Sequence, residues 1–249
     1  MQLFARHVSP EVADAIWRQR DEFLDGRRPR PQLLTATVMF TDLVDFTPLS
    51  EKQDPETLIT WLNELMEEMA EQVVRHGGVL NKYIGDSIMA IFGVPVPRKT
   101  DAECALDAVS AVNCALKMGE GLIHLNRRWQ LQGRPTTAMR IGIFTGPMVV
   151  GSLGSSQRLE YTVIGDSVNT ASRLEGYHKD HFEPALLESP CRVLIGSSTY
   201  GYVKDYFKTV EVGEITLKGK HTVVTAYRVL ARNDAIPCPG MNETRHEKH

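Results

Sequence analysis

The chain has 249 residues, 42% of them hydrophobic, and its 28 basic and 31 acidic residues give a formal net charge of −3. This length and composition suffice for one substantial hydrophobic core, so we expect a single main domain with appended ends. The small net charge excludes nucleic-acid binding driven by bulk charge, and the four cysteines lack the spacing of a zinc site or a disulfide framework.

No stretch approaches the roughly 18 uninterrupted apolar residues of a membrane span, and the N-terminus lacks the apolar core of a signal peptide. We therefore expect a cytoplasmic protein, or the cytosolic part of a membrane-bound one.

The first segment, residues 1–32, is expected to form a helix and a basic linker. Ser9 can cap a helix that has Pro10 at its first position, and this helix should end near Asp25. Residues 33–42 then predict a central strand, because a near-continuous β-prone run suits a strand that is covered on both faces.

The next elements are two helices that enclose a hairpin. After a loop at 43–54, apolar residues at helical spacing predict a helix over 55–76, which two glycines end. Residues 81–92 predict a β-hairpin, because apolar runs flank Gly85-Asp86, a dipeptide typical of tight hairpin turns. A second long helix is expected over about 101–129.

The C-terminal half predicts shorter elements. They are strands at 136–144 and 148–153 around a turn at 145–147, a helix at 166–177, a strand at 191–195, a helical turn at 199–202, and an antiparallel pair at 207–212 and 223–230. The order β-α-β-β-α-β with additional strands at the end predicts a mixed α/β (α+β) fold of the ferredoxin-like, split βαβ type. Residues 231–249 are expected to be a disordered tail.

Two carboxylates and one lysine are candidates for chemistry. Asp42 ends the predicted strand and Asp86 lies at the hairpin tip, so the two would be neighbours if their strands pair. Two such acids suit Mg²⁺, which takes one or two carboxylates plus substrate phosphates. Lys82 lies in the hairpin beside Tyr83 and Ile84, which we expect to be buried, so its ammonium should meet a partner from outside the hairpin.

Five motifs resemble, in order and spacing, those of class III nucleotidyl cyclase catalytic domains. They are FTDLVDFT (40–47), NKYIGDSIMAIFG (81–93), GIFTG (142–146), YTVIGDSVNTASRLE (161–175) and LKGK (217–220). The resemblance covers about residues 33–230. It implies a ferredoxin-like domain that works as a head-to-tail homodimer and converts a nucleoside triphosphate to its 3′,5′-cyclic monophosphate and pyrophosphate with two divalent ions, Mg²⁺ or Mn²⁺.

The resemblance assigns metal and phosphate contacts. Asp42 and Asp86 match the two metal-binding aspartates, and the backbone carbonyl of Leu43 matches a further ligand. Two ions about 4 Å apart can stabilise both the attacking and the leaving oxygen of a displacement at phosphorus. The outer phosphates should meet Lys218, with Lys220 as the alternative, and the backbone N–H groups of Phe46 and Thr47.

The resemblance also implies ATP as the substrate. Lys82 occupies the position of the family's base-reading lysine and can donate to N1 of adenine. Guanylyl cyclases have a similar motif, but with Glu at this position. Thr162 occupies the partner position, where its hydroxyl can accept from the exocyclic amine. This pair resembles many bacterial adenylyl cyclases and the bicarbonate-responsive soluble type.

Asn169 and Arg173 are four residues apart on a predicted helix and therefore project from one face. They match the family's transition-state pair, in which Asn orients the ribose and Arg neutralises charge at the α-phosphate. In the family these residues and the base-reading pair come from one subunit and the metal aspartates from the other. No general base is evident in the sequence.

Two features depart from the family's pattern. Some relatives have His and Arg where this chain has Phe144 and Pro147, so a phosphate contact from that arginine is absent or is taken over elsewhere, with Arg158 as one candidate. The segment 175–190 is longer than usual and carries His178 and His181, which we interpret as exposed loop residues.

Two other functions stay open at this stage. One is a guanylyl cyclase, which Lys82 and Thr162 disfavour; the other is a catalytically silent nucleotide-binding dimerisation module of a signalling protein. The sequence leaves the regulator open among bicarbonate, calcium, and an upstream sensor or membrane domain.

Overall fold

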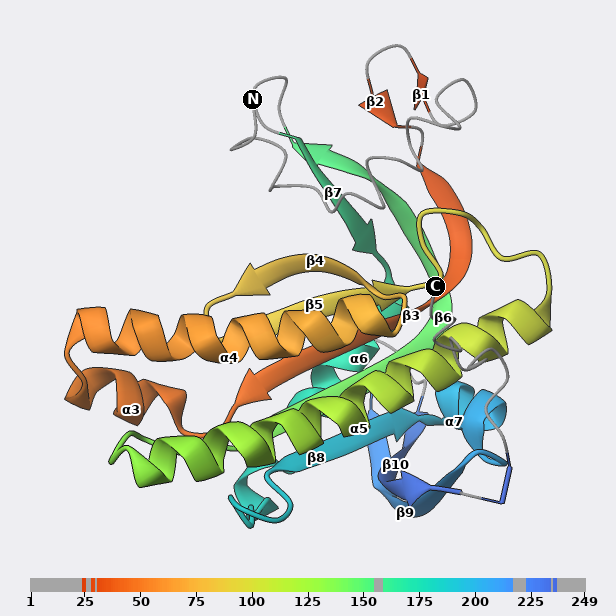
Figure 1. Ribbon diagram of the computed structural model, residues 1–249. Coiled ribbons are helices and arrows are strands. Elements are labelled where there is room, and N and C mark those ends of the chain that lie inside the picture. The colour runs from red at the N-terminus through yellow and green to blue at the C-terminus, as the bar shows by residue number, and fades with distance from the viewer. Residues whose placement is uncertain are drawn as a thin grey trace, which may run out of the picture.

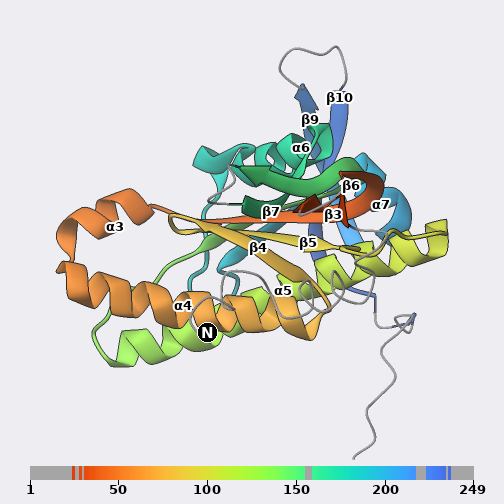
Figure 2. The same cartoon turned by 90° about the horizontal axis from the view of Figure 1, so that it is seen from above.

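The computed structural model describes residues 24–25, 28–29, 31–154, 159–216, 223–233 and 235–236. Its body is an eight-stranded sheet with helices on both faces (Figures 1 and 2). At the N-terminal side, Leu24–Asp25 (β1) pairs antiparallel with Arg28–Pro29 (β2), so the chain is extended where the predicted first helix would end. The rest of that helix and the predicted tail beyond residue 236 lie outside the described residues.

The centre of the sheet follows the predicted β-α-β-β-α-β order. Its elements are β3 (Gln32–Leu43), α4 (Pro55–Arg75), β4 (Val79–Ile84), β5 (Ser87–Phe92), α5 (Asp101–Leu131) and β6 (Met139–Gly154). The strands lie in the order β4-β5-β3-β6, and each neighbouring pair is antiparallel. Each crossover helix therefore returns the chain past one intervening strand, which confirms the ferredoxin-like plan.

The remaining elements extend this core. They are α3 (Phe46–Lys52), β7 (Leu159–Ile164), α6 (Asp166–Gly176), a 3₁₀ turn η2 (Lys179–His181), β8 (Cys191–Gly196), α7 (Ser197–Val203), β9 (Phe207–Thr216) and β10 (Val223–Arg232). β8 continues the sheet parallel to β6, and β10 and β9 follow as the expected antiparallel pair. β7 pairs with the far half of β6.

β6 is one continuous strand, so the predicted turn at 145–147 is wrong. Gly146 and Pro147 pair with Ala36 and Thr35 of β3 in an unbroken ladder. On the other edge of β6, β8 pairs with the strand before this point and β7 pairs with it only from Val149 onward. A proline is tolerated in a strand where no second ladder needs its N–H, and the long pairing with β3 overrides the local turn preference.

Two further differences concern short elements. The predicted loop 43–54 contains the seven-residue helix α3, and β7 is a strand that the sequence reading did not assign. Asp54 caps α4, and its carboxylate accepts from the Thr57 N–H at 3.1 Å; α5 is preceded by a capping box between Thr100 and Glu103. These caps explain why both long helices start where the sequence predicts.

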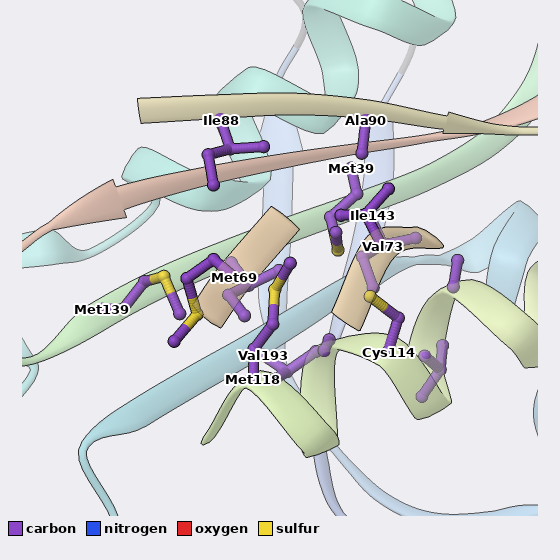
Figure 3. Packing of buried hydrophobic residues seen from close by; sticks show 14 of the residues in the cluster. Met39, Met69, Val73, Ile88, Ala90, Cys114, Met118, Met139, Ile143 and Val193 are labelled. Atoms are coloured by element: carbon purple, nitrogen blue, oxygen red, sulfur yellow. The ribbon is translucent and has the colours of Figure 1, made fainter. Parts of the chain in front are cut away.

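The hydrophobic core has two parts, one on each face of the sheet. α4 and α5 cover one face and α6 the other (Figure 2). Figure 3 shows Val73 of α4 and Cys114 of α5 on the side of the sheet reached by Met39. Val38, the residue before Met39 on β3, points to the opposite face of the sheet, which α6 covers, and packs with Ala171. β3 is therefore covered on both faces, as its near-continuous apolar run predicts.

The described residues contain no helix long and apolar enough to cross a membrane. In the described part of the chain, Cys104, Cys114 and Cys191 are free thiols.

Candidate active site

The two predicted metal aspartates lie together at one end of the sheet. Thr41 pairs with Ile88 across β3 and β5, which places Asp42 beside the β4–β5 turn that carries Asp86. The backbone N–H of Leu43 donates to Asp86 Oδ2 at 3.3 Å, and the Ser87 hydroxyl donates to Asp42 Oδ1 at 2.7 Å. The expectation that a strand end and a hairpin tip bring the two acids together is confirmed.

Arg140 joins this cluster from β6, where it is paired with Asp42 in the ladder. Its guanidinium donates to Asp42 Oδ2 at 2.5 Å, to Glu175 Oε1 at 2.8 Å and to the Leu43 carbonyl at 3.4 Å. The residue is 8% exposed, so this is a buried cation held by two carboxylates. Arg140 and Glu175 are not among the site residues that the sequence predicts; the available signal is a charged residue, Arg140, inside an apolar strand.

The electrostatics of the cluster favour a cation. Burial raises the pKa of Asp86, and the charge of Asp42 raises it further. Burial also raises the pKa of Glu175, although the hydrogen bond from Arg140 opposes this effect. Two carboxylates that repel each other in a partly buried site are stabilised in their charged form by a divalent ion between them.

The donor set fits Mg²⁺ or Mn²⁺ but is small. Among the described residues, no group of three or more His, Cys, Asp and Glu side chains is placed to hold a metal ion. Asp42 and Asp86, with the Leu43 carbonyl beside them, supply oxygen ligands only. Mg²⁺ commonly takes one or two carboxylates and completes its shell with water and substrate phosphate, so the pair is sufficient for a substrate-dependent site.

A cavity of about 420 Å³ opens over the aspartates. It is lined by Asp42, Leu43, Val44, Asp45, Phe46, Thr47, Pro48, Asp86, Arg140, Lys179 and Phe182. α3 begins at Phe46, and Asp45 makes no side-chain cap to it. The N–H groups of the first helical turn have no partner within the helix, so they are available to a ligand in this cavity.

Lys179 and Phe182 reach the cavity from the segment after α6. Arg192, 7% exposed, holds that segment by donating to the Glu175 carbonyl at 2.9 Å and to the His178 carbonyl at 3.0 Å. Its guanidinium also lies over the Phe182 ring, 5.4 Å from the centroid. The sequence predicts a loop here, and nothing in it indicates that the segment lines the cavity.

A second group of predicted residues lies where β4 meets β7. Lys82 forms an ion pair with Glu160, so the expected partner from outside the hairpin exists. Asn81 donates from Nδ2 to the Tyr161 carbonyl at 2.8 Å, and the Thr162 hydroxyl donates to Asn81 Oδ1 at 3.3 Å. The two positions that the sequence predicts to read the base, 82 and 162, are thus linked through neighbouring residues within one chain.

One expectation at this hairpin is wrong. Tyr83 and Ile84 are 50% and 49% exposed rather than buried. β4 is the edge strand of the sheet, so these two side chains have no covering layer in a single chain.

Asn169 and Arg173 lie one turn apart on α6, as predicted; Asn169 is exposed and Arg173 half-buried. Within the described residues, neither side chain forms a hydrogen bond or an ion pair. Neither lines the cavity over Asp42 and Asp86, and the same holds for Lys82. Within one chain these three predicted residues therefore lie apart from the cavity over Asp42 and Asp86.

The remaining predicted positions lie either outside the described residues or away from the cavity. Lys218, Lys220 and Arg158 lie outside the described residues. Pro147 is exposed on β6, and its carbonyl accepts from the Ser167 hydroxyl at 2.8 Å. His178 and His181 are exposed, as expected, with ring centroids 5.2 Å apart.

Comparison with known proteins agrees with this geometry. Residues 30–230 match the family described as adenylate and guanylate cyclase catalytic domain. Adenylate cyclase 1 of Rhizobium meliloti is 37% identical over 195 residues, which cover 78% of this chain and 27% of the relative. The adenylate cyclase of Anabaena cylindrica is 31% identical over 202 residues, 78% of this chain and 36% of the relative. The chain thus spans about a third or less of the length of these two relatives.

Solved structures of both purine specificities share the fold. The adenylyl cyclase CyaB from P. aeruginosa superposes with a TM-score of 0.73 at 33% identity, covering 84% of this chain and 100% of that one. The guanylyl cyclase Cya2 superposes with a TM-score of 0.70 at 29% identity, covering 82% and 95%. The fold alone therefore does not decide between ATP and GTP, and the side chains must.

Proposed function

Because this chain belongs to the family of adenylate and guanylate cyclase catalytic domains, we propose that it is an adenylyl cyclase domain, which converts ATP to 3′,5′-cyclic AMP and pyrophosphate. Residues 33–230 form the catalytic domain in this proposal. The observation that carries it is the convergence of Asp42 and Asp86 under a cavity large enough for a triphosphate, together with a separate base-reading pair at Lys82 and Thr162.

Asp42 and Asp86 would hold divalent cations, Mg²⁺ or Mn²⁺ and two per site, with the Leu43 carbonyl as a further ligand. When bound, these ions would stabilise the negative charge that develops on the attacking 3′ oxygen and on the departing pyrophosphate. The mutual repulsion of the two carboxylates supports a cation between them, since the charge of Asp42 contributes to the raised pKa of Asp86.

The chain's own groups bind the triphosphate. The N–H groups of Phe46 and Thr47, at the start of α3, would meet a phosphate, and Lys218 would contact the outer phosphates. Lys179 lines the same cavity and adds a positive charge on the segment that Arg192 fixes. We assign to Lys179 part of the neutralisation that an arginine at position 147 supplies in some relatives.

Lys82 and Thr162 select the base. Lys82 exchanges Glu160 for N1 of adenine, to which an ammonium can donate, whereas guanine presents a donor at N1. Thr162 accepts from the exocyclic amine of adenine. Both contacts would be lost with guanine, which argues for ATP over GTP.

Asn169 orients the ribose and Arg173 neutralises charge at the α-phosphate. Both belong to the partner half-site, because neither lines the cavity of its own chain. A twofold homodimer, in which each site takes its aspartates from one subunit and these groups from the other, completes two equivalent sites. The exposed apolar side chains of Tyr83 and Ile84 on the edge strand β4 support a partner surface there.

The test is product analysis. The purified chain is incubated with ATP or with GTP in the presence of Mn²⁺, and the products are resolved by chromatography. Cyclic AMP as the main product supports the proposal. Cyclic GMP as the main product would contradict the base assignment, and no cyclic product at high protein concentration would indicate a silent module. A titration with bicarbonate at fixed pH tests whether that ion activates the domain, as the resemblance to the bicarbonate-responsive type suggests.

A further inference from the structure

The strand β4 carries an irregularity at the base-reading site. In the β4–β5 ladder Leu80 pairs with Ala90 and Lys82 with Met89, so Asn81 is an extra residue in β4. Consecutive residues of a regular strand point to opposite faces, but a bulge re-aims them. Here Asn81 and Lys82 both reach β7, where they contact Thr162 and Glu160.

The hydrogen bonds of Asn81 fix the direction of its amide. The Tyr161 carbonyl can only accept, so the group 2.8 Å from it must be the NH₂ of Asn81. The Oδ1 of Asn81 is then the atom that faces Thr162, and it too can only accept. The hydroxyl proton of Thr162 is therefore committed to Asn81, and the hydroxyl presents only lone pairs to any other partner.

We propose that Asn81 is a specificity-determining positioning residue, which holds the Thr162 hydroxyl as a hydrogen-bond acceptor and thereby favours adenine over guanine. This inference rests on the proposed function and adds to it a residue that does not touch the substrate. The exocyclic amine of adenine donates to an acceptor, whereas O6 of guanine needs a donor. Thr162 can donate to O6 only by breaking its bond to Asn81.

The burial of Thr162 strengthens the effect. The residue is 5% exposed, so water has little access to its hydroxyl and cannot readily replace Asn81 as the acceptor of its proton. Without Asn81 the hydroxyl could rotate and serve either purine, as free hydroxyls do. Asn81 thus turns an ambivalent group into a selective one.

The experiment measures the ratio of kcat/KM for ATP to kcat/KM for GTP. Asn81→Ala should lower this ratio by about three- to tenfold, the worth of one hydrogen bond, mainly through better use of GTP. Asn81→Asp keeps an acceptor for Thr162 but sets its second oxygen against the Tyr161 carbonyl, which can only accept, so it should keep only part of the wild-type preference. In a Thr162→Val background, Asn81→Ala should leave the ratio unchanged, because the group it positions is gone.

Two results would overturn the inference: an unchanged ratio in Asn81→Ala, as after a proportional loss with both substrates, or an effect that persists in the Thr162→Val background. Equilibrium binding of 3′-deoxy-ATP and 3′-deoxy-GTP, which lack the attacking hydroxyl, gives the ratio of the two affinities and so reports the base preference without turnover. A chain that makes no cyclic product but whose analogue preference follows Asn81 contradicts only the proposed function. A chain that cyclises ATP with a ratio indifferent to Asn81 contradicts only this inference.

Discussion

Asp42 and Arg140 face each other across the ladder between β3 and β6, and the guanidinium holds one oxygen of that carboxylate while it also holds Glu175 of α6. The arginine thus ties a metal-binding candidate to the helix that carries Asn169 and Arg173. In the proposed dimer these two groups of residues would serve different sites, but within each chain Arg140 joins the elements that carry them.

Removing Arg140 should destabilise the fold strongly. Arg140→Ala leaves Glu175 and Asp42 without their buried counter-ion, and we expect the free energy of unfolding in urea to fall by about 3 kcal/mol. Adding Glu175→Gln should recover part of that loss. The exposed pair of Arg75 with Glu71 is the control, since Arg75→Ala should cost less than about 0.5 kcal/mol. Equal losses for the two arginine variants would contradict the structural role of Arg140.

Loss of either aspartate should stop turnover. Asp42→Ala or Asp86→Ala removes a metal ligand, and kcat with ATP and Mn²⁺ should fall by roughly a hundredfold or more. Asp205→Ala, an exposed carboxylate outside the cavity, should leave the rate unchanged. Near-normal rates in folded aspartate variants would remove the metal assignment.

Asp86 should make stability depend on pH. Its pKa in the folded protein is raised, so the folded state binds more protons than the unfolded chain at pH values between the unfolded and folded pKa. Without metal, the free energy of unfolding should therefore fall as pH rises through that window, from near the ordinary Asp value upward. Asp86→Asn should remove this slope and raise Tm slightly at neutral pH.

Added Mg²⁺ or Mn²⁺ should offset the loss of stability that the ionised Asp86 causes in the wild type, because a cation bound to the folded state stabilises it. Thermal unfolding across pH, with and without metal, makes the comparison. A Tm at neutral pH that is lower in Asp86→Asn than in the wild type would show that the carboxylate is not under electrostatic stress.

Gly142 should be essential for the position of α6. A Cβ at this residue would lie 2.2 Å from the Ala171 carbonyl oxygen and 2.3 Å from the Glu175 backbone nitrogen, and neither backbone atom can move without the helix. Gly142→Ala should therefore cost about 3 kcal/mol or more, as overpacking against backbone does at the upper end of its range. The control is Gly201→Ala, because Gly201 lies in α7 with open space around its Cβ position. Gly133 would not serve, because its positive φ disfavours any side chain. Equal stabilities of Gly142→Ala and Gly201→Ala in urea would contradict the close packing of α6 on β6.

Much of this fold could be predicted from local patterns. The long helices follow from apolar spacing and their caps, and the meeting of Asp42 with Asp86 follows from a strand end and a hairpin tip on paired strands. Turn chemistry misled in one place: Gly146 and Pro147 are typical of a turn, but pairing with β3 over the whole length of the strand keeps β6 extended.

Long-range contacts in the site could not be predicted. The bond between Arg140 and Glu175 joins residues 35 positions apart, and it depends on how α6 packs on β6. The bulge at Asn81 depends on the register between β4 and β5, which no local pattern specifies. Tyr83 and Ile84 resemble core residues in the sequence. An apolar strand can lie at the centre of a sheet, at its edge or against a partner, and its hydrophobicity alone does not distinguish these places.

The most direct test of a site shared between two subunits is complementation. An Asp42→Ala chain and an Arg173→Ala chain, each inactive alone, are mixed and allowed to exchange subunits. A mixed dimer then carries both substitutions in one site and none in the other. With random exchange half of the dimers are mixed, so the mixture should recover about one quarter of wild-type cyclic AMP production. If mixed dimers form, as shown by differently tagged chains co-purifying, and activity stays at the level of the separate variants, the shared site is contradicted.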